Sequence, residues 1–263
     1  MDWFSMLVLF VVGLPIGSFL NVVIWRLPRE ENIAFPPSHC PACDGKIKPY
    51  DNIPVVSYLI LGGKCRSCGA PISIRYPLVE LLTALLFAAA WPLTGSALSW
   101  ELAAAIIFSG IGVAVSGIDI PHRIIPDSLS LGGLAVGLIL APLRAGEFSA
   151  LLPAFLSALF GAALLLLVRV AGKALFKREA MGWGDVKLIA MIGAFVGWRG
   201  VILTVFLASF LGAVGGAIAM ASSAETRENR LVPFGPFLMA AGLIVFYFGD
   251  SIIGWYLSTF FPS

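Results

Sequence analysis

The sequence contains few charged residues, because Lys, Arg, Asp and Glu together make up only 12% of its 263 residues. A soluble globular domain carries roughly twice that fraction, so the composition excludes an ordinary soluble enzyme. The apolar residues, 59% of the chain, are gathered in runs of roughly 15–22 residues, long enough to cross a bilayer core. Because these runs continue to the C-terminal end, we do not expect a signal peptide followed by a soluble domain.

The sequence also lacks a long internal repeat and a low-complexity tail, so its organisation follows from the apolar runs alone. We predict an all-α polytopic membrane protein with about eight transmembrane helices, of which the fourth and sixth are short. The predicted spans are 3–25, 77–95, 99–118, 128–143, 149–171, 186–198, 200–221 and 236–258. We divide the chain into a first helix (1–25), a cytoplasmic four-cysteine domain (26–76) and a transmembrane peptidase domain (77–263).

The net charge of +2 says little about partners, but the positions of the positive residues indicate an orientation. With eight spans, most positive residues fall on one side of the membrane. The opposite side receives only Arg144 and Arg199. Since positive residues favour the cytoplasm, we expect the polar loop to be cytoplasmic and both termini to face outward. The residues on the cytoplasmic side are Arg26, Arg29, Lys46, Lys48, Lys64, Arg66, Arg75, Arg123, Arg169, Lys173, Lys177, Arg178, Lys187, Arg227 and Arg230.

All four cysteines of the sequence lie in this polar loop, as the two pairs Cys40-Pro-Ala-Cys43 and Cys65-Arg-Ser-Cys68. About twenty residues separate the pairs, and a glycine lies close after each pair. Two such turns direct four thiolates toward one point and leave backbone N–H groups free to bond the sulfurs, which suits tetrahedral zinc. We therefore predict a structural zinc ion with these four ligands, which leave no open position for a catalytic water.

Two other interpretations of the cysteines are less favoured. Disulfides are disfavoured because the predicted orientation places the loop in a reducing compartment. A thioredoxin-like redox site needs one CxxC at a helix start and not two matched pairs. The basic neighbours Lys46, Lys64 and Arg66 are expected to offset the negative charge of a zinc tetrathiolate.

Two aspartates lie at the cytoplasmic edge of otherwise apolar segments. Asp119 ends the third span, which Pro121 and Pro126 prevent from continuing smoothly. Asp185 opens the sixth span within Met181-Gly-Trp-Gly-Asp185, where glycines allow close approach of another chain. Carboxylates at a membrane edge are energetically costly and are therefore candidates for function.

On the predicted topology Asp119 and Asp185 share one face of the membrane. When two carboxyl groups are close together, one is held protonated while the other acts as the base on a shared water. That arrangement suits an aspartic protease, which needs neither a metal ion nor a covalent nucleophile. The sequence places both residues on one side, but it does not establish that their side chains meet.

Ordinary structural roles remain open for the same residues. Asp119 can solvate a helix end, and Asp185 can be a helix-terminal acid near Lys187. Asp127, which precedes Ser128, is expected to be the N-cap of the fourth helix. His122 is expected to be an interface or loop residue rather than a ligand.

Taken together, the motifs resemble those of the bacterial type IV prepilin peptidases, which are aspartyl membrane proteases of the Gly-x-Gly-Asp type. The segments that carry the resemblance follow one another in order from the first to the sixth span and so cover most of the chain. They are Gly17-Ser-Phe-Leu-Asn-Val-Val-Ile-Trp-Arg-Leu-Pro28, the two CxxC pairs, Asp119 with Ile125-Pro-Asp127, and Gly182-Trp-Gly-Asp185-Val-Lys-Leu188.

The resemblance implies that Asp119 and Asp185 are the catalytic pair and that the chain cleaves the basic leader from prepilins and pseudopilins, after a glycine, at the cytoplasmic face of the bacterial inner membrane. We expect Gly182 and Gly184 to leave room for the substrate backbone. The cysteine loop marks the family's long form, many members of which also methylate the new N-terminal amine with S-adenosylmethionine. Glu80 matches an acidic position of the family, and either methyl transfer or pairing with Arg75 is open for it.

No glycine-rich strand–helix motif for S-adenosylmethionine is present in the sequence, so this cofactor is expected from the resemblance alone. Partners are expected to be pilin-like substrates of type IV pilus or type II secretion systems and the lipid bilayer, with no nucleic acid. The sequence does not identify which pilin is the substrate.

Two alternatives compete with this interpretation. A presenilin-type intramembrane protease also uses Gly-x-Gly-Asp, but the cysteine loop and the segment 17–28 argue against it. A cation transporter with membrane-edge aspartates usually shows matched halves, and the sequence has no such symmetry.

Overall fold

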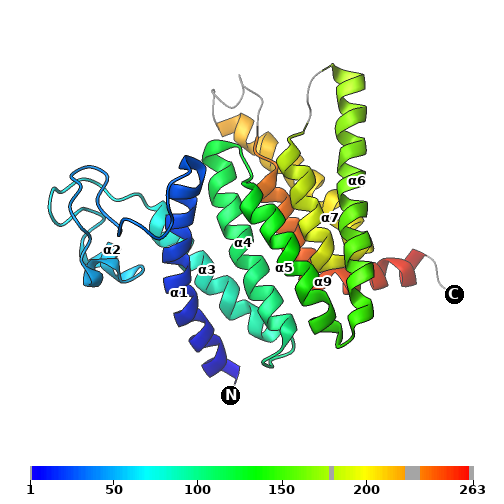
Figure 1. Cartoon of the computed structure of the whole chain (residues 1–263), viewed down its shortest axis with the longest axis horizontal. Coiled ribbons are helices and arrows are strands. Elements are labelled where there is room, and N and C mark those ends of the chain that lie inside the picture. Colours follow the sequence, from blue (N-terminus) through cyan, green and yellow to red (C-terminus); the bar gives the residue numbers. More distant parts are fainter. Residues whose placement is uncertain (1, 178–180, 223–231, 261–263) are drawn as a thin grey trace. The chain divides into compact units, whose positions relative to one another are not determined.

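The computed structural model describes residues 2–177, 181–222 and 232–260, and these residues form an almost entirely helical protein (Figure 1). The predicted all-α class is therefore confirmed for the described part of the chain. Arg178, Arg227 and Arg230, which contributed to the predicted orientation, lie outside the described residues. The long helices are α1 (Asp2–Arg26), α3 (Arg75–Leu93), α4 (Trp100–His122), α5 (Asp127–Ala145), α6 (Leu151–Phe176), α7 (Trp183–Ser222) and α9 (Gly235–Phe260), and the short elements are η1 (Leu27–Arg29), η2 (Pro49–Asn52), α2 (Val56–Ile60) and η3 (Phe148–Ala150).

Seven of the described helices are long and apolar enough to span a membrane. The predicted sixth and seventh spans both lie in α7, which is interrupted at Gly197. The φ and ψ of Gly197 are 74° and 170°, a region that essentially only glycine adopts. This one residue separates α7 into two helical segments, so the apolar stretches that the sequence indicates are all present.

The two segments of α7 fold back on each other rather than continuing as one rod. A Cβ atom on Gly193 would lie 3.1 Å from Cγ2 of Val201. In a straight helix, residues eight apart are separated by about 12 Å along the axis. The short contact therefore requires the chain to reverse at Gly197, which makes α7 a helical hairpin.

The structure divides into two compact units, which we describe separately: one comprises 1–98 and 105–118, and the other comprises 99–104 and 119–263. In the first unit, α1 packs closely against α3. A Cβ atom on Gly13 would lie 2.6 Å from Cα of Ala84, and one on Gly17 would lie 2.6 Å from Cα of Glu80. Small residues four apart on α1 thus let the two backbones approach, as helices in membranes often require.

The polar loop of the first unit is anchored at the end of α1 by Arg26. This buried guanidinium donates hydrogen bonds to the carbonyl oxygens of Asn32, Ile33 and Pro36 at 3.0, 3.2 and 2.6 Å. At the other end of the loop, the Asn21 side-chain amide donates to the Tyr76 carbonyl at 3.0 Å. The loop is therefore fixed to the helices at both ends by buried polar groups of α1.

In the second unit, α7 lies against α5, α6 and α9 (Figure 1). Arg144 of α5 forms a bidentate ion pair with Glu101, at 2.6 and 2.8 Å, and donates to the Phe195 carbonyl at 2.9 Å. The ion pair therefore stabilises the C-terminal end of the first α7 segment, just before the helix is interrupted at Gly197. Glu101 lies eighteen residues before Asp119 on α4, or about 27 Å along the helix.

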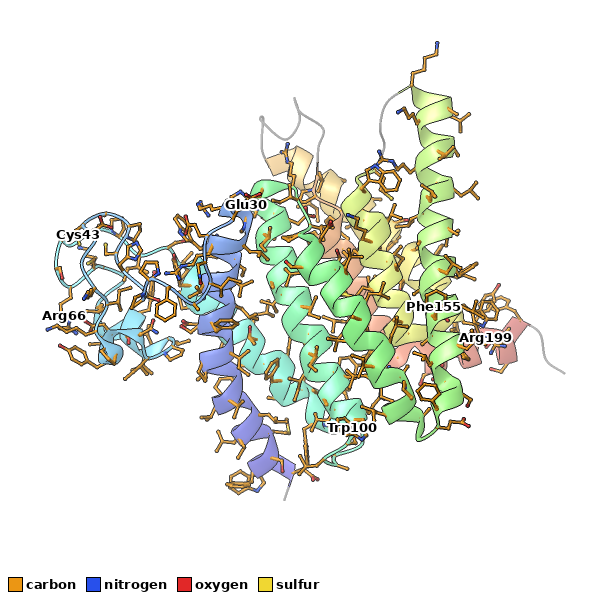
Figure 2. The ribbon with its side chains drawn as sticks, in the orientation of Figure 1. Glu30, Cys43, Arg66, Trp100, Phe155 and Arg199 are labelled. Carbon is orange, nitrogen blue, oxygen red and sulfur yellow. The ribbon has the colours of Figure 1, made fainter. Side chains whose placement is uncertain are left out.

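Many large apolar side chains on the long helices are exposed, as expected where lipid replaces water. On α6, Leu152, Phe155, Leu159 and Leu167 are each more than half exposed, and Phe155 is labelled in Figure 2. Such contiguous apolar surface is unfavourable in water but suits a lipid-facing helix. The chain is therefore a multi-pass membrane protein.

The close α1–α3 packing predicts that Gly17→Ala destabilises the protein. The added Cβ meets backbone rather than a flexible side chain, and overpacking of this kind costs about 1–3 kcal/mol. We expect a lower midpoint of thermal unfolding in detergent micelles for this variant.

The matched control is Gly132→Ala, which adds the same methyl group at a helix position with no heavy atom within 4 Å of the new Cβ. This control is expected to unfold at or above the wild-type temperature. Equal midpoints for Gly17→Ala and wild type would show that α1 and α3 do not pack as described.

Candidate active site and metal centre

Asp119 lies in the last turn of α4, and the end of that helix is defined locally. Arg123 adopts a left-handed conformation and its N–H donates to the Asp119 carbonyl at 2.8 Å, which closes the helix. The Asp119 side chain is 5% exposed, and its Oδ2 accepts a 3.0 Å hydrogen bond from the Gly235 N–H. A residue 116 positions later in the chain thus holds this carboxylate.

Asp185 is the third residue of α7 and is half-buried. Its Oδ2 accepts a 3.1 Å hydrogen bond from the Gly182 N–H, immediately before the helix. An acidic residue at this position that bonds back to the N-cap amide is half of a capping box. The structural role that the sequence left open for Asp185 is therefore real, and the bond leaves its Oδ1 available for another partner.

The two aspartates are brought together around Ile125. A Cβ atom on Gly184 would lie 2.9 Å from Cβ of Ile125. On Gly235 it would lie 3.2 Å from Cδ1 of Ile125 and 2.7 Å from Oδ2 of Asp119. The carboxylate of Asp119 and the helix start that carries Asp185 therefore both lie beside Ile125.

The two glycines of Gly-x-Gly-Asp have different surroundings. Gly184 is packed against Ile125, so a side chain at this position would displace the residue between the two aspartates. Gly182 is exposed, and the nearest atom to a Cβ there would be Oδ2 of Asp185 at 3.4 Å, an ordinary contact. Only Gly182 thus has free surface beside a carboxylate.

Asp127 has a role different from the one expected for it. The N-cap of α5 is Pro126, and Asp127 is the first helical residue and makes no cap hydrogen bond, so the predicted N-cap is wrong. Its carboxylate forms an ion pair with Lys187 at 2.6 and 2.7 Å. Pro126 already supplies the extended backbone that precedes the helix, which frees the Asp127 side chain to pair with Lys187.

Sequence reasoning missed two residues that support the site. Arg169 of α6 donates to the Met181 carbonyl at 2.7 Å, and its guanidinium lies 4.6 Å from the ring centroid of Trp183. Gly235 supplies the N–H that binds Asp119. The signals were an arginine within an apolar run and the Pro233-Phe-Gly-Pro236 segment before the last span.

The four cysteines converge as predicted and are not joined by disulfides. Their sulfur atoms all lie within 4.8 Å of one another, and the Cys40–Cys68 pair is 3.9 Å apart. Tetrahedral zinc at 2.3 Å from each sulfur requires sulfur atoms about 3.8 Å apart. The cluster can therefore bind a metal ion with little rearrangement.

Each CxxC pair is followed by a residue with positive φ, Asp44 at 53° and Gly69 at 72°. These turns direct backbone N–H groups at the sulfurs, as expected. Hydrogen bonds from the Cys68 and Ser67 N–H groups lower the pKa of the Cys65 thiol to about 7. Cys43 accepts one from Gly45, which lowers its pKa, but hydrogen bonds with the sulfurs of Cys68 and Cys40 stabilise the protonated thiol, and together these effects raise the pKa to about 12.

The expected surroundings of the cluster are only partly present. Arg66 lies in the same loop as Cys43 (Figure 2), but its guanidinium is bidentate to Asp51 at 2.6 and 2.9 Å, so its charge is already paired. This ion pair lowers the pKa of the Asp51 carboxyl through the hydrogen bond from Arg66. It also joins the second cysteine pair to η2.

Glu80 is 7% exposed, and its carboxylate accepts a 2.7 Å hydrogen bond from the Val55 N–H. The alternative of an ion pair with Arg75 is wrong, because no such pair exists among the described residues. The Arg75 guanidinium instead lies 5.5 Å from the ring centroid of Tyr76.

Comparison with known families assigns both parts of the chain. Residues 11–93 match the bacterial peptidase A24 N-terminal domain, and residues 106–217 match the type IV leader peptidase family. The first match contains the four cysteines and the second contains Asp119 and Asp185. The alternatives of a presenilin-type protease and a cation transporter have no support from these matches.

The curated relatives agree over nearly the whole chain. The prepilin leader peptidase/N-methyltransferase of Pseudomonas aeruginosa is 40% identical over 94% of this chain and 91% of its own length. That of Aeromonas hydrophila is 40% identical over 99% and 96%, and that of Myxococcus xanthus is 44% identical over 81% and 62%. No solved structure matches significantly. The chain therefore belongs to the bacterial peptidase A24 family of type IV prepilin leader peptidases/N-methyltransferases.

Proposed function

We propose that Asp119 and Asp185 are the catalytic pair with which this prepilin leader peptidase/N-methyltransferase cleaves its substrates. The observation that carries the proposal is that Ile125 lies beside both the Asp119 carboxylate and the start of the helix that carries Asp185, more than sixty residues later in the sequence. Each carboxylate has one oxygen held by a backbone N–H, from Gly235 or Gly182. The remaining oxygens are available to share a water molecule.

The mechanism follows from the chemistry of paired carboxyl groups. One carboxylate removes a proton from the shared water as its oxygen attacks the scissile carbonyl, and the other carboxyl donates its proton to the developing oxyanion. The two fixed backbone hydrogen bonds keep the reacting oxygens in place, so no reorganisation is needed at the moment of reaction. The exposed surface at Gly182 is where the extended substrate backbone passes.

The substrates are prepilins and pseudopilins, whose apolar helix enters the bilayer while the basic leader stays in the cytoplasm. Asp119 ends α4 and Asp185 begins α7, so the scissile bond is cut at a membrane edge. The excess of positive residues on the loop side supports a cytoplasmic location for this edge and for the cysteine loop.

Zinc is the metal that best fits the cysteine cluster, with Cys40, Cys43, Cys65 and Cys68 as ligands. Four thiolates complete its coordination, so its role is to hold the two turns of the loop together. Methylation of the new N-terminus uses S-adenosylmethionine, which supplies the methyl group to the amine.

We expect Asp119→Asn and Asp185→Asn each to lower the rate of leader cleavage by roughly 10²–10⁴-fold, because either change removes half of the acid–base pair. The matched control is Asp127→Asn, which removes a nearby carboxylate that pairs with Lys187. Cleavage of a purified prepilin in detergent micelles measures all three rates. Near wild-type cleavage by either of the first two variants would refute the assignment.

Gly184→Ala and Gly182→Ala should impair the enzyme in different ways. At Gly184 the methyl group displaces Ile125, so we expect kcat to fall through misplacement of the aspartates. At Gly182 it covers exposed surface, so we expect KM to rise with little change in kcat. The kinetics of prepilin cleavage separate these effects, and the same change in both variants would contradict the distinct roles of the two glycines.

Cys68→Ser should abolish stoichiometric zinc in the purified protein, because three thiolates and one hydroxyl bind zinc poorly at neutral pH. The control Ser67→Ala, one residue away, keeps all four sulfurs and should keep the metal. Elemental analysis by mass spectrometry measures zinc per chain. Zinc binding to the metal-free protein should release protons, since the raised pKa of Cys43 means that its thiol is protonated at pH 7.

A further inference from the structure

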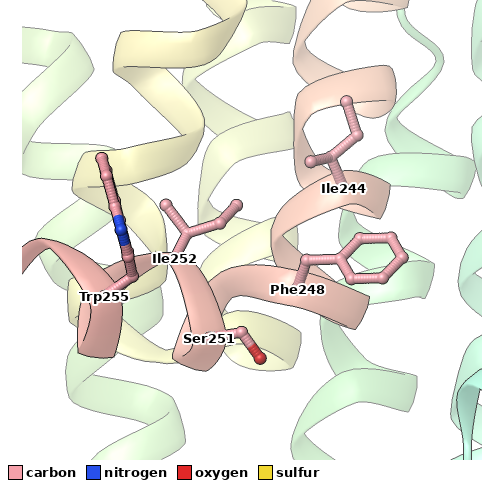
Figure 3. Close-up of a pocket in the computed structure, with 5 residues that line it drawn as sticks. All are labelled: Ile244, Phe248, Ser251, Ile252 and Trp255. Carbon is pink, nitrogen blue, oxygen red and sulfur yellow. The ribbon is translucent and has the colours of Figure 1, made fainter.

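A hollow of about 410 Å³ lies on α9 and is lined by Ile244, Phe248, Ser251, Ile252 and Trp255 (Figure 3). All five residues belong to one helix, and none of them is ionisable. This hollow offers a surface to lipid rather than a site for chemistry. The first unit contains a cavity of a different character.

That cavity has a volume of about 560 Å³ and lies wholly within the first unit, between α1, the polar loop and α3. Its size falls in the range of small-molecule sites. The lining includes Ser18, Asn21 and Val22 from α1, Val55 from the loop, and Glu80 from α3. We propose that this cavity, built around Asn21 and Glu80, binds S-adenosylmethionine and presents it to the new N-terminal amine.

The cavity contains a buried polar atom that lacks a partner. Asn21 is 2% exposed and donates through its amide nitrogen to the Tyr76 carbonyl, but its Oδ1 has no hydrogen-bond partner. A buried acceptor left unpaired costs about 1–3 kcal/mol. A ligand with an N–H or O–H group, such as the amino, ribose or adenine groups of the methyl donor, satisfies this acceptor.

Glu80 provides a buried negative charge on the same wall. Its carboxylate accepts from the Val55 N–H. Val55 has a φ of 61°, an outlier for a β-branched residue, so the loop residue that Glu80 binds is held in a strained conformation. With Arg75 turned to Tyr76, Glu80 has no cation to pair with among the described residues, and the sulfonium group of the methyl donor supplies one.

The lining also includes Tyr58, an aromatic residue on which adenine can stack. In the transfer, the amine nitrogen bonds the methyl carbon as the carbon–sulfur bond breaks, the electron pair stays on sulfur, and the amine proton passes to Glu80. All lining residues lie within 18–80, inside the match to the bacterial N-terminal domain and outside the match that contains the aspartates. This inference rests on the methyl transfer proposed above.

Calorimetric titration of the purified full chain in detergent micelles with S-adenosylmethionine and, separately, with S-adenosylhomocysteine, which lacks the sulfonium charge, tests the site. Wild type should bind the charged ligand more tightly. Glu80→Gln should reduce that preference by about tenfold, which is the loss of one ion pair worth about 1.4 kcal/mol. Val22→Phe fills the cavity without removing a hydrogen bond. This variant should weaken the binding of both ligands by at least about tenfold.

The matched control is Glu30→Gln, an exposed glutamate of the same unit that does not line the cavity and should bind both ligands as wild type does (Figure 2). Leader cleavage and zinc content should stay unchanged in every variant. A purely structural Glu80 would leave the preference for the charged ligand intact, which overturns the role of its carboxylate.

Methylation of a precleaved pilin, read by mass spectrometry, separates the two levels of the proposal. If wild type methylates and binds but Val22→Phe and Glu80→Gln behave like wild type, the cavity is not the site, although the proposed function stands. If wild type neither binds the donor nor methylates, both the proposed methyl transfer and this inference fail.

Discussion

The contact of Ile125 with Gly184 and Gly235 is the constraint on which the aspartate site depends. The Ile125 side chain fits where Gly184 and Gly235 have no side chain of their own. Gly184 precedes Asp185 in the chain, and the Gly235 N–H binds Asp119. Ile125 lies in the non-helical segment 123–126, because the proline that follows it disfavours a helical conformation. A short non-helical stretch between α4 and α5 therefore sets the relation of two carboxylates from different helices.

The same device recurs elsewhere in both units, because lipid provides no hydrophobic drive between helices. Gly161 of α6 lies against the Ile189 carbonyl, and Gly193 of α7 lies against the Ser157 carbonyl. A Cβ atom on either glycine would lie within 3 Å of that carbonyl oxygen. These glycines bring helix backbones into direct contact. In the bilayer, close packing of small residues thus stabilises helix association, as burial of apolar side chains does in water. This packing gives the site rigid support.

Buried polar groups have specific partners at the places where helices end. The Arg144–Glu101 pair binds the Phe195 carbonyl just before the α7 reversal, and Arg169 binds the Met181 carbonyl just before the start of α7. Free carbonyl groups at such positions are costly in a bilayer. Guanidinium groups satisfy them and at the same time position the helix that carries Asp185.

The sequence alone determined the helical class, the apolar spans, the four-cysteine cluster and the identity of Asp119 and Asp185 as candidates. These features depend on local patterns: runs of apolar residues, the CxxC spacing, and carboxylates next to glycine or proline. Only the tertiary structure decided that Asp127 pairs with Lys187, that Gly184 packs on Ile125, that Gly235 holds Asp119, and that Asn21 and Glu80 line one cavity. Each of these contacts joins residues far apart in the chain, and no local periodicity specifies which distant backbone a glycine or a carboxylate will meet.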